Sequence, residues 1–232
     1  KRMLRTRACR SVCGLIAVLG MLLSLPGPDL AMAGEQGPVE LLQDRRDTVL
    51  AIVDQDPEVL EDTVRLRAIA DEYLLPHVDF MTLSRWVIGK HWRSASPEQR
   101  RAFASEFRDL LLNNYLRSVT EYRDQTIEFI PLRGVEKKTR VVVHGLVDQP
   151  AGPPVHVNFR MHRVGNDWLI YDIVVEGVSL ATTHRSMFSQ QIRDIGLDGV
   201  IAELQLRNEA VWNEKEPSGE TDPAGKPAAA TD

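Results

Sequence analysis

Apolar residues recur at helical spacing through the first part of the chain. Residues 38–75 carry two such patterns, separated by the sequence DQDPE, in which Asp56 is expected to cap the second helix with Pro57 at its first position. A shorter helix is predicted after PHVDF, with Asp79 as its N-cap and Gly89 as its end. This part of the chain is therefore expected to be helical throughout.

The next helix has the clearest start signal in the sequence. In Ser96-Pro97-Glu98-Gln99 a hydroxyl cap, a proline and a glutamine form a capping box, and the helix is predicted to run to about Tyr122. Its apolar side chains cover an arc of about 140° that widens to about 200°, whereas about 100° is enough to seal one core. These side chains are Phe103, Phe107, Leu110, Leu111, Leu112, Tyr115 and Val119. The surplus predicts either a helix between two packed layers or a helix with one side facing a cavity.

Four strand-like segments follow, joined by short turns. They are 126–133, 139–147, 154–163 and 168–176. Links this short fit antiparallel hairpins, because parallel strands need crossovers of about a dozen residues. After Gly177 the pattern returns to helices, at about 179–195 and 198–211. The predicted fold class is α+β: a single domain with a curved, four-stranded antiparallel sheet packed by helices.

The last strand pattern, DWLIYDIVVEGVSL, runs through a glycine into the next helix. Strict alternation would place one apolar set on a single face of the sheet. This set is Leu169, Tyr171, Ile173 and Val175, opposite Ile170, Asp172, Val174 and Glu176. Phe159 and Met161 of the preceding strand are expected to extend the same wall. A face this large and apolar is expected to cover either a core or a bound apolar ligand.

Both ends of the chain are expected to lie outside this domain. Residues 1–33 begin with basic residues, continue with an apolar run and end in Ala-Met-Ala, which is the order of a secretory signal peptide. The apolar run is shorter than the roughly 20 residues that span a membrane. Residues 214–232 are rich in Pro, Gly, Ala and charge and are predicted to be a disordered tail. The exported domain is therefore predicted to be 34–213.

The charge of the chain argues against two classes of partner. The sequence has 28 Lys and Arg against 33 Asp and Glu, a net charge of −5; removal of residues 1–33 would take away five basic residues and one acidic residue, which leaves 23 against 32, or −9. An acidic exported protein is a poor partner for nucleic acid or for an anionic membrane surface. Both cysteines, Cys9 and Cys13, lie in the segment expected to be removed, so neither a disulfide nor a cysteine metal site is expected.

Candidate catalytic motifs are few. GVSLA at 177–181 lies where the G-x-S-x-G nucleophile elbow of an α/β-hydrolase would be, but its last residue is Ala181 and the expected sheet is antiparallel, so Ser179 is interpreted as a helix cap. The histidines show no metal-ligand spacing and no nucleotide-binding loop is present, so no metal or cofactor is expected. The alternative function is a small isomerase or cyclase that uses His77 or Asp79 as acid or base.

Two longer motifs resemble a known family. The first is D-F, then R-x-x-x-G-x-x-W-R, S-P-E-Q and F-x-x-x-F, followed by a tyrosine; its residues are Asp79, Phe80, Arg85, Gly89, Trp92, Arg93, Ser96–Gln99, Phe103, Phe107 and Tyr115. The second is W-x-x-x-D-x-x-x-E-G-V-S-L followed by R-S-x-F, at 168–188. Together they resemble the MlaC / toluene-tolerance auxiliary (Ttg2D-like) family of periplasmic phospholipid-binding proteins. The resemblance covers roughly residues 38–212.

The resemblance implies both a fold and a function. The fold is a cystatin-like, nuclear-transport-factor-like cone whose curved sheet and helices enclose an apolar cavity. The function is that of a non-enzymatic phospholipid carrier of the Mla pathway, which maintains outer-membrane lipid asymmetry. The implied partners are phospholipid, an outer-membrane lipoprotein complex, and an inner-membrane ABC transporter complex with its lipid-binding subunit. The acidic tail is not part of the resemblance.

A carrier of this kind must hide two acyl chains from water. A diacyl lipid exposes about thirty methylene or methyl groups, each worth roughly 0.8 kcal/mol of burial, or on the order of 20 kcal/mol in all. The cavity is therefore expected to reach roughly 1,000 Å³, the upper end for ligand pockets. Periodicity predicts that its wall is formed by Trp86, Phe103, Phe107, Leu111, Tyr115, Phe159, Ile173, Val175 and Met187, with Arg185 at the mouth. None of these positions is carried over from ligand contacts in the family.

Overall fold

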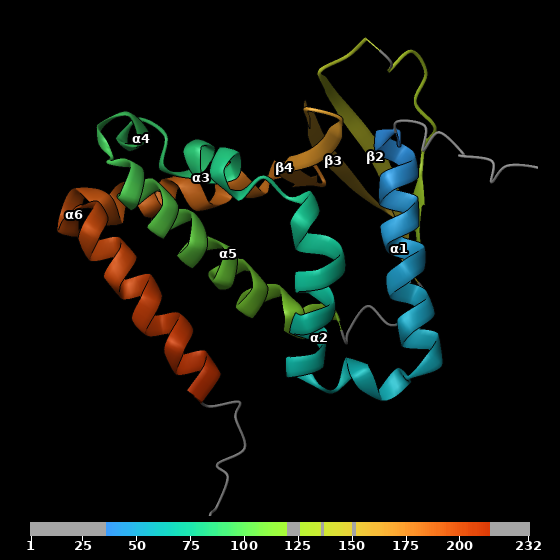
Figure 1. The fold of residues 1–232 in the computed structure, drawn as a ribbon, viewed down its shortest axis with the longest axis horizontal. Helices are drawn as coiled ribbons and strands as arrows, with labels where there is room; N and C mark the ends of the chain where they lie inside the picture. The colour runs from blue at the N-terminus through green and yellow to red at the C-terminus, as the bar shows by residue number, and fades with distance from the viewer. Residues whose placement is uncertain (1–35, 120–125, 136, 150–151, 214–232) are drawn as a thin grey trace, which may run out of the picture. The chain divides into compact units, whose positions relative to one another are not determined.

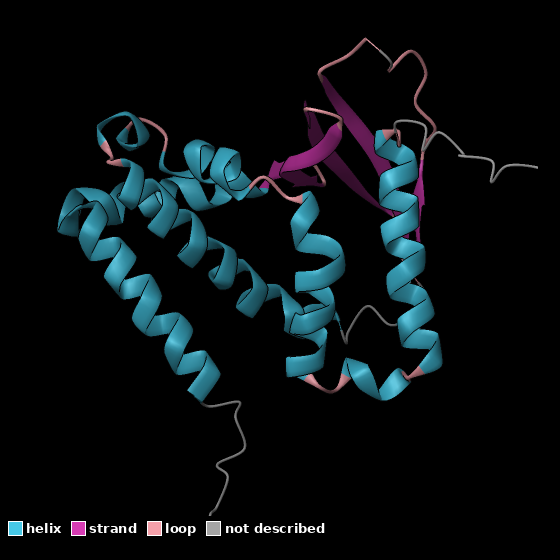
Figure 2. Cartoon of the chain, in the orientation of Figure 1, coloured by secondary structure: helices cyan, strands magenta, loops and turns pink. Residues whose placement is uncertain are grey.

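The computed structural model describes residues 36–119, 126–135, 137–149 and 152–213, and it combines helices with one antiparallel sheet (Figure 1; Figure 2). The predicted α+β class is therefore confirmed. The predicted signal peptide and tail, and the end of the long helix near Tyr122, lie outside these residues. Within the four described ranges, no helix combines the length and apolar character that crossing a membrane requires.

The sheet has five strands rather than the predicted four. They are β1 Thr126–Phe129, β2 Arg140–Asp148, β3 Val155–Val164, β4 Asp167–Val175 and β5 Val178–Ser179, in the spatial order β1-β2-β3-β4-β5. Every neighbouring pair is antiparallel, as the short turns predicted. The additional strand, β5, is a two-residue segment that pairs with the end of β4. The chain reaches it by a turn through Gly177, whose φ of 81° favours glycine.

The helices form two groups around this sheet. In chain order the helices are α1 Pro38–Gln55, the 3-10 helix η1 Pro57–Leu60, α2 Thr63–Ile69, the π-helical turn η2 Ala70–Leu74, the 3-10 helix η3 Leu75–His77, α3 Phe80–Ile88, α4 His91–Ser94, α5 Pro97–Val119 and α6 Leu180–Asn213. Helix α6 is two helices joined at Gly196, as predicted. In Figure 1, α3, α5 and α6 lie together at the left, and α1 runs beside the sheet at the right.

The predicted signals at two helix starts are confirmed. Ser96 Oγ accepts a hydrogen bond from the Gln99 backbone N–H (3.2 Å) while the Gln99 side chain accepts one from the Ser96 N–H (2.9 Å), which completes the capping box at α5. Asp79 caps α3 by accepting from the Thr82 N–H at 2.8 Å. Gly89 ends that helix with a φ of 55°. These local interactions fix where α3 and α5 begin.

The prediction for Asp56 is confirmed in position only: it stands at the N-cap of η1, with Pro57 in the first turn, but it does not cap a long helix. Its side chain makes no capping bond to the short helix η1 that follows Pro57, and it pairs instead with Arg65. The cap of α2 is Asp62, which accepts from the N–H groups of Val64 and Arg65 at 3.0 and 3.1 Å. The proline can start only a single 3-10 turn here, and the longer helix needs the second aspartate six residues on.

Strand β4 does not alternate as the sequence predicted, because it contains a β-bulge at Tyr171. Met161 of β3 pairs with Ile170 and Arg160 pairs with Asp172, so Tyr171 has no partner and the alternation shifts by one residue. As a result Ile173 lies on the same face as Ile170, whereas the prediction put them on opposite faces. The predicted face is therefore split: Ile173 and Val175 line the space between the sheet and the helices, whereas Leu169 and Tyr171 do not, and Tyr171 stacks on Trp86 of α3.

Helix α5 connects two of the three hydrophobic cores. Phe103, Phe107 and Leu110 pack against α3 and α6, while Leu112 and Leu116 pack against α2 and η1. The third core lies between α1 and the sheet, around Val143, Met161 and Trp168. Packing on two sides explains much of the wide apolar arc of α5.

The aromatic cluster between α5 and α6 includes a half-buried histidine, His184. The rings of His184 and Phe107 meet edge to face with centroids 5.2 Å apart, and the Phe188 ring lies 6.1 Å away. Burial lowers the pKa of His184 from its ordinary value, because the charged imidazolium would lose its hydration there. Folding therefore favours the neutral form of this ring.

We expect His184 to make the fold sensitive to acid. An unfolded histidine binds a proton below a pH of about 6.5, so its contribution to stability is complete above that pH and is lost as the pH falls through the lower folded pKa. The melting temperature of His184→Phe should fall less between pH 8 and pH 5 than that of the unchanged protein. His156→Phe, at an exposed position on β3, is the control. Equal pH dependence in the unchanged protein and His184→Phe would contradict the prediction.

Candidate functional site

A cavity of about 670 Å³ lies between the covered face of the sheet and the helices. Its sheet side is formed by β1, β3, β4 and β5, and its helical side by α1, the η2–η3 segment, α3, α5 and the start of α6. The side chains of the wall are mostly apolar. They include Leu42, Leu74, Leu75, Val78, Phe80, Leu83, Leu111, Leu112, Tyr115, Leu116, Ile127, Phe129, Phe159, Ile170, Ile173, Val175, Val178 and Leu180.

Five of the ten residues predicted for the site lie in this wall. They are Leu111, Tyr115, Phe159, Ile173 and Val175. The bulge at Tyr171 is what brings Ile173 and Val175 to the same side as Ile170, so that three apolar residues of β4 point into one space. Tyr115 and Val175 are also half-exposed, which places them near an opening of the cavity.

The other five predicted residues do not line this cavity. Phe103 and Phe107 are completely buried and stack on each other with centroids 5.7 Å apart, because their side of α5 faces α3 and α6. Met187 is 41% exposed. Trp86 and Arg185 border a separate cleft of about 460 Å³ on another face of α3. Helical periodicity shows which apolar residues of α5 share a side of the helix. It does not show whether that side packs against α3 and α6 or faces the cavity.

Several wall residues were not predicted, and two signals could have indicated them. Residues 74–80 form an apolar cluster around a proline, and their η3 turn places Leu75, His77 and Val78 in the wall. In β1, Ile127 and Phe129 alternate with polar residues. The Ile127 side chain lies directly over Gly145 of β2, where a Cβ atom would come within 3.0 Å of Ile127 Cδ1. The missing side chain at Gly145 thus lets Ile127 settle onto the sheet.

Charged residues of the wall are neutralised by partners on the same or neighbouring elements. Arg46 pairs with Asp47 at 2.8 Å, and its guanidinium donates to the Ile127 carbonyl at 2.8 Å. Arg108 pairs with Asp109 at 2.9 Å, and it also contacts Asp71. Such pairing lowers the cost of placing an apolar molecule beside these groups.

Asp172 holds the wall to the start of α6. This buried carboxylate accepts hydrogen bonds from Ser179 Oγ (2.7 Å) and from the Ala181 N–H (3.1 Å), and it pairs with Arg160 at 2.9 Å. Ser179 Oγ in turn accepts from the Thr182 N–H at 3.2 Å, which confirms its predicted capping role. The hydroxyl is thus committed to structural hydrogen bonds.

The alternative acid–base pair is not assembled. His77 lies in the cavity wall, where burial, and secondly the positive charge of Arg45, lower its pKa. Asp79 instead binds the Thr82 hydroxyl at 2.6 Å and lies 2.9 Å from His162 Nε2. His77 therefore lies in the cavity wall, whereas Asp79 caps α3 and contacts His162, and the two do not form a pair. Over the described ranges, no cluster of His, Cys, Asp or Glu could hold a metal ion.

Comparison with known proteins identifies the family. The sequence model of the family described as MlaC protein matches residues 43–206.

The chain belongs to the MlaC family.

Individual relatives agree with this assignment and cover most of the chain. The intermembrane phospholipid transport system binding protein MlaC of Haemophilus influenzae is 26% identical over 176 residues, which cover 74% of this chain and 82% of that protein. The toluene tolerance protein ttg2D of Pseudomonas putida is 24% identical over 212 residues, which cover 87% of this chain and 98% of that protein. The family resemblance found in the two sequence motifs is therefore confirmed.

A solved structure shares the fold. It is that of a phospholipid-binding protein from Ralstonia solanacearum in complex with a phospholipid, with a TM-score of 0.67 and 28% identity. The match covers 75% of this chain and 98% of that protein. A mixed helical and antiparallel-sheet domain is therefore common to this MlaC-family chain and a protein whose structure holds a phospholipid.

Proposed function

We propose that this MlaC-family protein is a phospholipid carrier that holds acyl chains in the cavity between the sheet and α5. The observation that carries the proposal is the wall itself: apolar side chains from most of the helices and strands meet around one space of about 670 Å³. Apolar contacts have no preferred direction, so acyl chains can be recognised without any sequence motif. The wall residues Leu111, Tyr115, Phe159, Ile173 and Val175 are proposed to contact the chains.

The energy of lipid transfer supports a cavity of this kind. Hiding about thirty methylene or methyl groups is worth on the order of 20 kcal/mol, which only a large apolar surface can supply. The volume lies within the ordinary range of roughly 300–1,000 Å³ for ligand pockets and below the roughly 1,000 Å³ expected from the sequence. We infer that the cavity takes one diacyl lipid. The headgroup would then lie at the opening near Tyr115 and Val175, exposed to solvent.

The carrier is proposed to work in the periplasm after cleavage of residues 1–33. It would accept lipid from one membrane complex and deliver it to another, the partners being an outer-membrane lipoprotein complex and an inner-membrane ABC transporter complex with its lipid-binding subunit. Support comes from the relative that is named as the binding protein of an intermembrane phospholipid transport system. No chemical step on the lipid is part of this proposal.

An isomerase or cyclase on the same fold is the less favoured function. It would depend on His77 in the cavity wall, whose pKa is lowered from its ordinary value by burial and then by the charge of Arg45. Asp79, the other candidate, is engaged by Thr82 and His162. A carrier accounts for the apolar wall as a whole, whereas the enzyme would use one residue of it.

The proposal is tested by the lipid that purifies with the protein. We expect the exported protein, extracted with organic solvent and analysed by mass spectrometry and phosphate assay, to carry diacyl phospholipid in an amount close to one per protein. Delipidated protein should regain that load from phospholipid vesicles. Protein that emerges free of phospholipid and does not take it up from vesicles would contradict the carrier function.

A further inference from the structure

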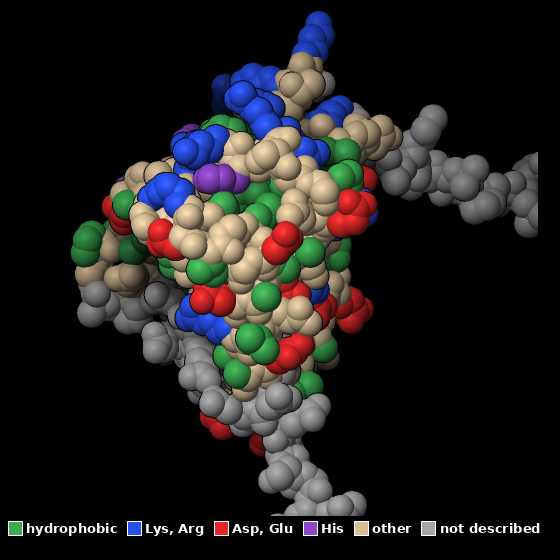
Figure 3. Space-filling view, turned by 90° about the vertical axis from the view of Figure 1, so that its left-hand side faces the viewer, with side chains coloured by type: hydrophobic (Ala, Val, Ile, Leu, Met, Phe, Trp, Pro, Cys, Tyr) green, Lys and Arg blue, Asp and Glu red, His purple; other side chains and the backbone are tan. Residues whose placement is uncertain are grey.

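A second cleft, separate from the cavity, gathers positive charge. It has a volume of about 460 Å³ and is lined by Arg85, Trp86, Gly89, Lys90, Trp92, Arg93 and Arg185. These residues come from α3, the turn after it, α4 and the first half of α6. Figure 3 shows Lys and Arg side chains gathered on the upper part of the face that lies at the left of Figure 1. No acidic side chain of the described chain lines the cleft.

The four cations of the cleft, Arg85, Lys90, Arg93 and Arg185, lie together with no carboxylate of the described residues between them. Within the part of the chain that the structure describes, none of their side chains has an ion pair or a hydrogen bond. By contrast, Arg67 and Arg108 each pair with a carboxylate within 3 Å. Like charges left together repel one another, so an acidic protein that keeps four of them unpaired has a site suited to an external anion.

The cleft also holds one of its cations in place. The Arg185 guanidinium packs against Gly89, where a Cβ atom would lie 2.8 Å from Nη2. Gly89 thus ends α3 with its positive φ and leaves room for the arginine. The positive field extends to the neighbouring His91, whose pKa is lowered by burial and then by the charges of Lys90 and Arg193. Arginine presents a planar fork of donors that matches a carboxylate.

The rim of the cleft has the composition of a protein interface. Trp86, stacked on Tyr171 with ring centroids 6.1 Å apart, is 43% exposed, and Trp92 lies beside it in the lining. Trp and Arg are enriched where proteins bind each other. The lipid cavity is bordered by Phe80 and Leu83 on a different face of α3, so the cleft is not the headgroup site of a lipid in the cavity.

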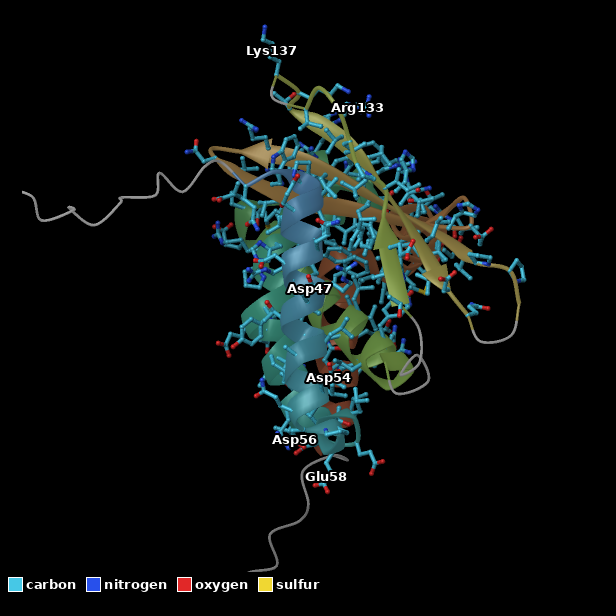
Figure 4. All side chains as sticks on the ribbon, turned by 90° about the vertical axis from the view of Figure 1, so that its right-hand side faces the viewer. Asp47, Asp54, Asp56, Glu58, Arg133 and Lys137 are labelled. Atoms are coloured by element: carbon cyan, nitrogen blue, oxygen red, sulfur yellow. The ribbon has the colours of Figure 1, made fainter. Side chains whose placement is uncertain are left out.

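We propose that this cleft is a docking site for an acidic segment of a partner protein. A concave, local site can receive projecting carboxylates. A flat anionic bilayer would reach only the rim of such a cleft, and the acidic residues Asp47, Asp54, Asp56 and Glu58 of α1 and η1 lie on the opposite side of the molecule (Figure 4). The attraction is expected to weaken as salt screens it.

The test uses charge reversal with a matched control. Lys90→Glu/Arg93→Glu changes two exposed cations of the cleft, and Arg133→Glu/Lys137→Glu makes the same change of charge in the exposed β1–β2 connection (Figure 4). Fluorescein-labelled octaglutamate peptide is the first probe. Its dissociation constant should rise about tenfold for the cleft variant, and stay within twofold for the control.

Envelope membranes of the encoding bacterium are the second probe, compared with protein-free liposomes made from their extracted lipids. Binding to the membranes should be lost after protease treatment, competed by the peptide, and weakened in the cleft variant alone. Equal weakening in both variants would overturn the proposal, and so would cleft-dependent binding to the liposomes, which would mark a lipid-surface site. The phospholipid load and melting temperature of both variants should be unchanged, so failure of docking is distinguishable from failure of the carrier function.

Discussion

Replacing Ile173 by tryptophan is expected to remove most of the bound phospholipid from a protein that remains folded. Ile173 lies opposite Phe159 in the sheet, and both side chains line the cavity. The larger ring would occupy the volume that acyl chains need. Because it enters a space that the protein leaves open, the melting temperature of the delipidated variant should change little. In a close-packed core the same enlargement would cost about 1–3 kcal/mol.

The control for this experiment is Val142→Trp. Val142 lies on β2, is 38% exposed and is not part of the cavity wall, so it gains the same kind of ring on the open side of the sheet. Both variants are measured for phospholipid per protein as purified and for melting temperature after delipidation, because bound lipid itself stabilises the fold. A full lipid load in Ile173→Trp would show that acyl chains do not occupy this part of the cavity.

Truncating Phe107 is expected to cause the largest loss of stability. The Phe107 ring is completely buried and contacts Phe103, Phe188 and His184. Phe107→Ala should lower the free energy of unfolding of delipidated protein by about 3–5 kcal/mol, the range for a large ring removed from a packed core. The lipid load of the fraction that remains folded should be unchanged.

Phe159→Ala provides the opposite case. Phe159 borders the cavity, so its removal enlarges an existing space instead of opening a new one inside a core. We expect a clearly smaller loss of stability together with a changed lipid load. Urea unfolding of the two delipidated variants and phosphate assay of the purified proteins give the comparison. A loss of lipid in Phe107→Ala equal to that in Phe159→Ala would place Phe107 in the wall after all.

The sequence predicted where helices begin and end better than it predicted which elements pack against each other. The capping box at Ser96, the cap at Asp79 and the stop at Gly89 depend on residues within one helical turn, and all three are confirmed. Asp56 does not cap the longer helix α2, because Pro57 after it starts only a 3-10 turn. Five of the predicted site residues lie in the cavity wall; whether they contact lipid stays a prediction.

The errors in the candidate site have a tertiary origin. Period-two alternation assumes a regular strand, and nothing in the sequence DWLIYDIVV indicates that Tyr171 forms a bulge. Likewise an apolar arc on α5 does not say that Phe103 and Phe107 meet α6 while Leu111 and Tyr115 meet the cavity. Those assignments depend on how distant segments cross, which local spacing does not determine.

The carboxylate at Asp172 has a consequence for how this sequence can change over evolution. One buried side chain serves Arg160 on the neighbouring strand, Ser179 on β5 and the first turn of α6. Loss of the carboxylate alone would leave a buried hydroxyl and a guanidinium without their acceptor. We therefore expect positions 160, 172 and 179 to vary together, although they lie on three different strands and only one of them, Asp172, borders the cavity.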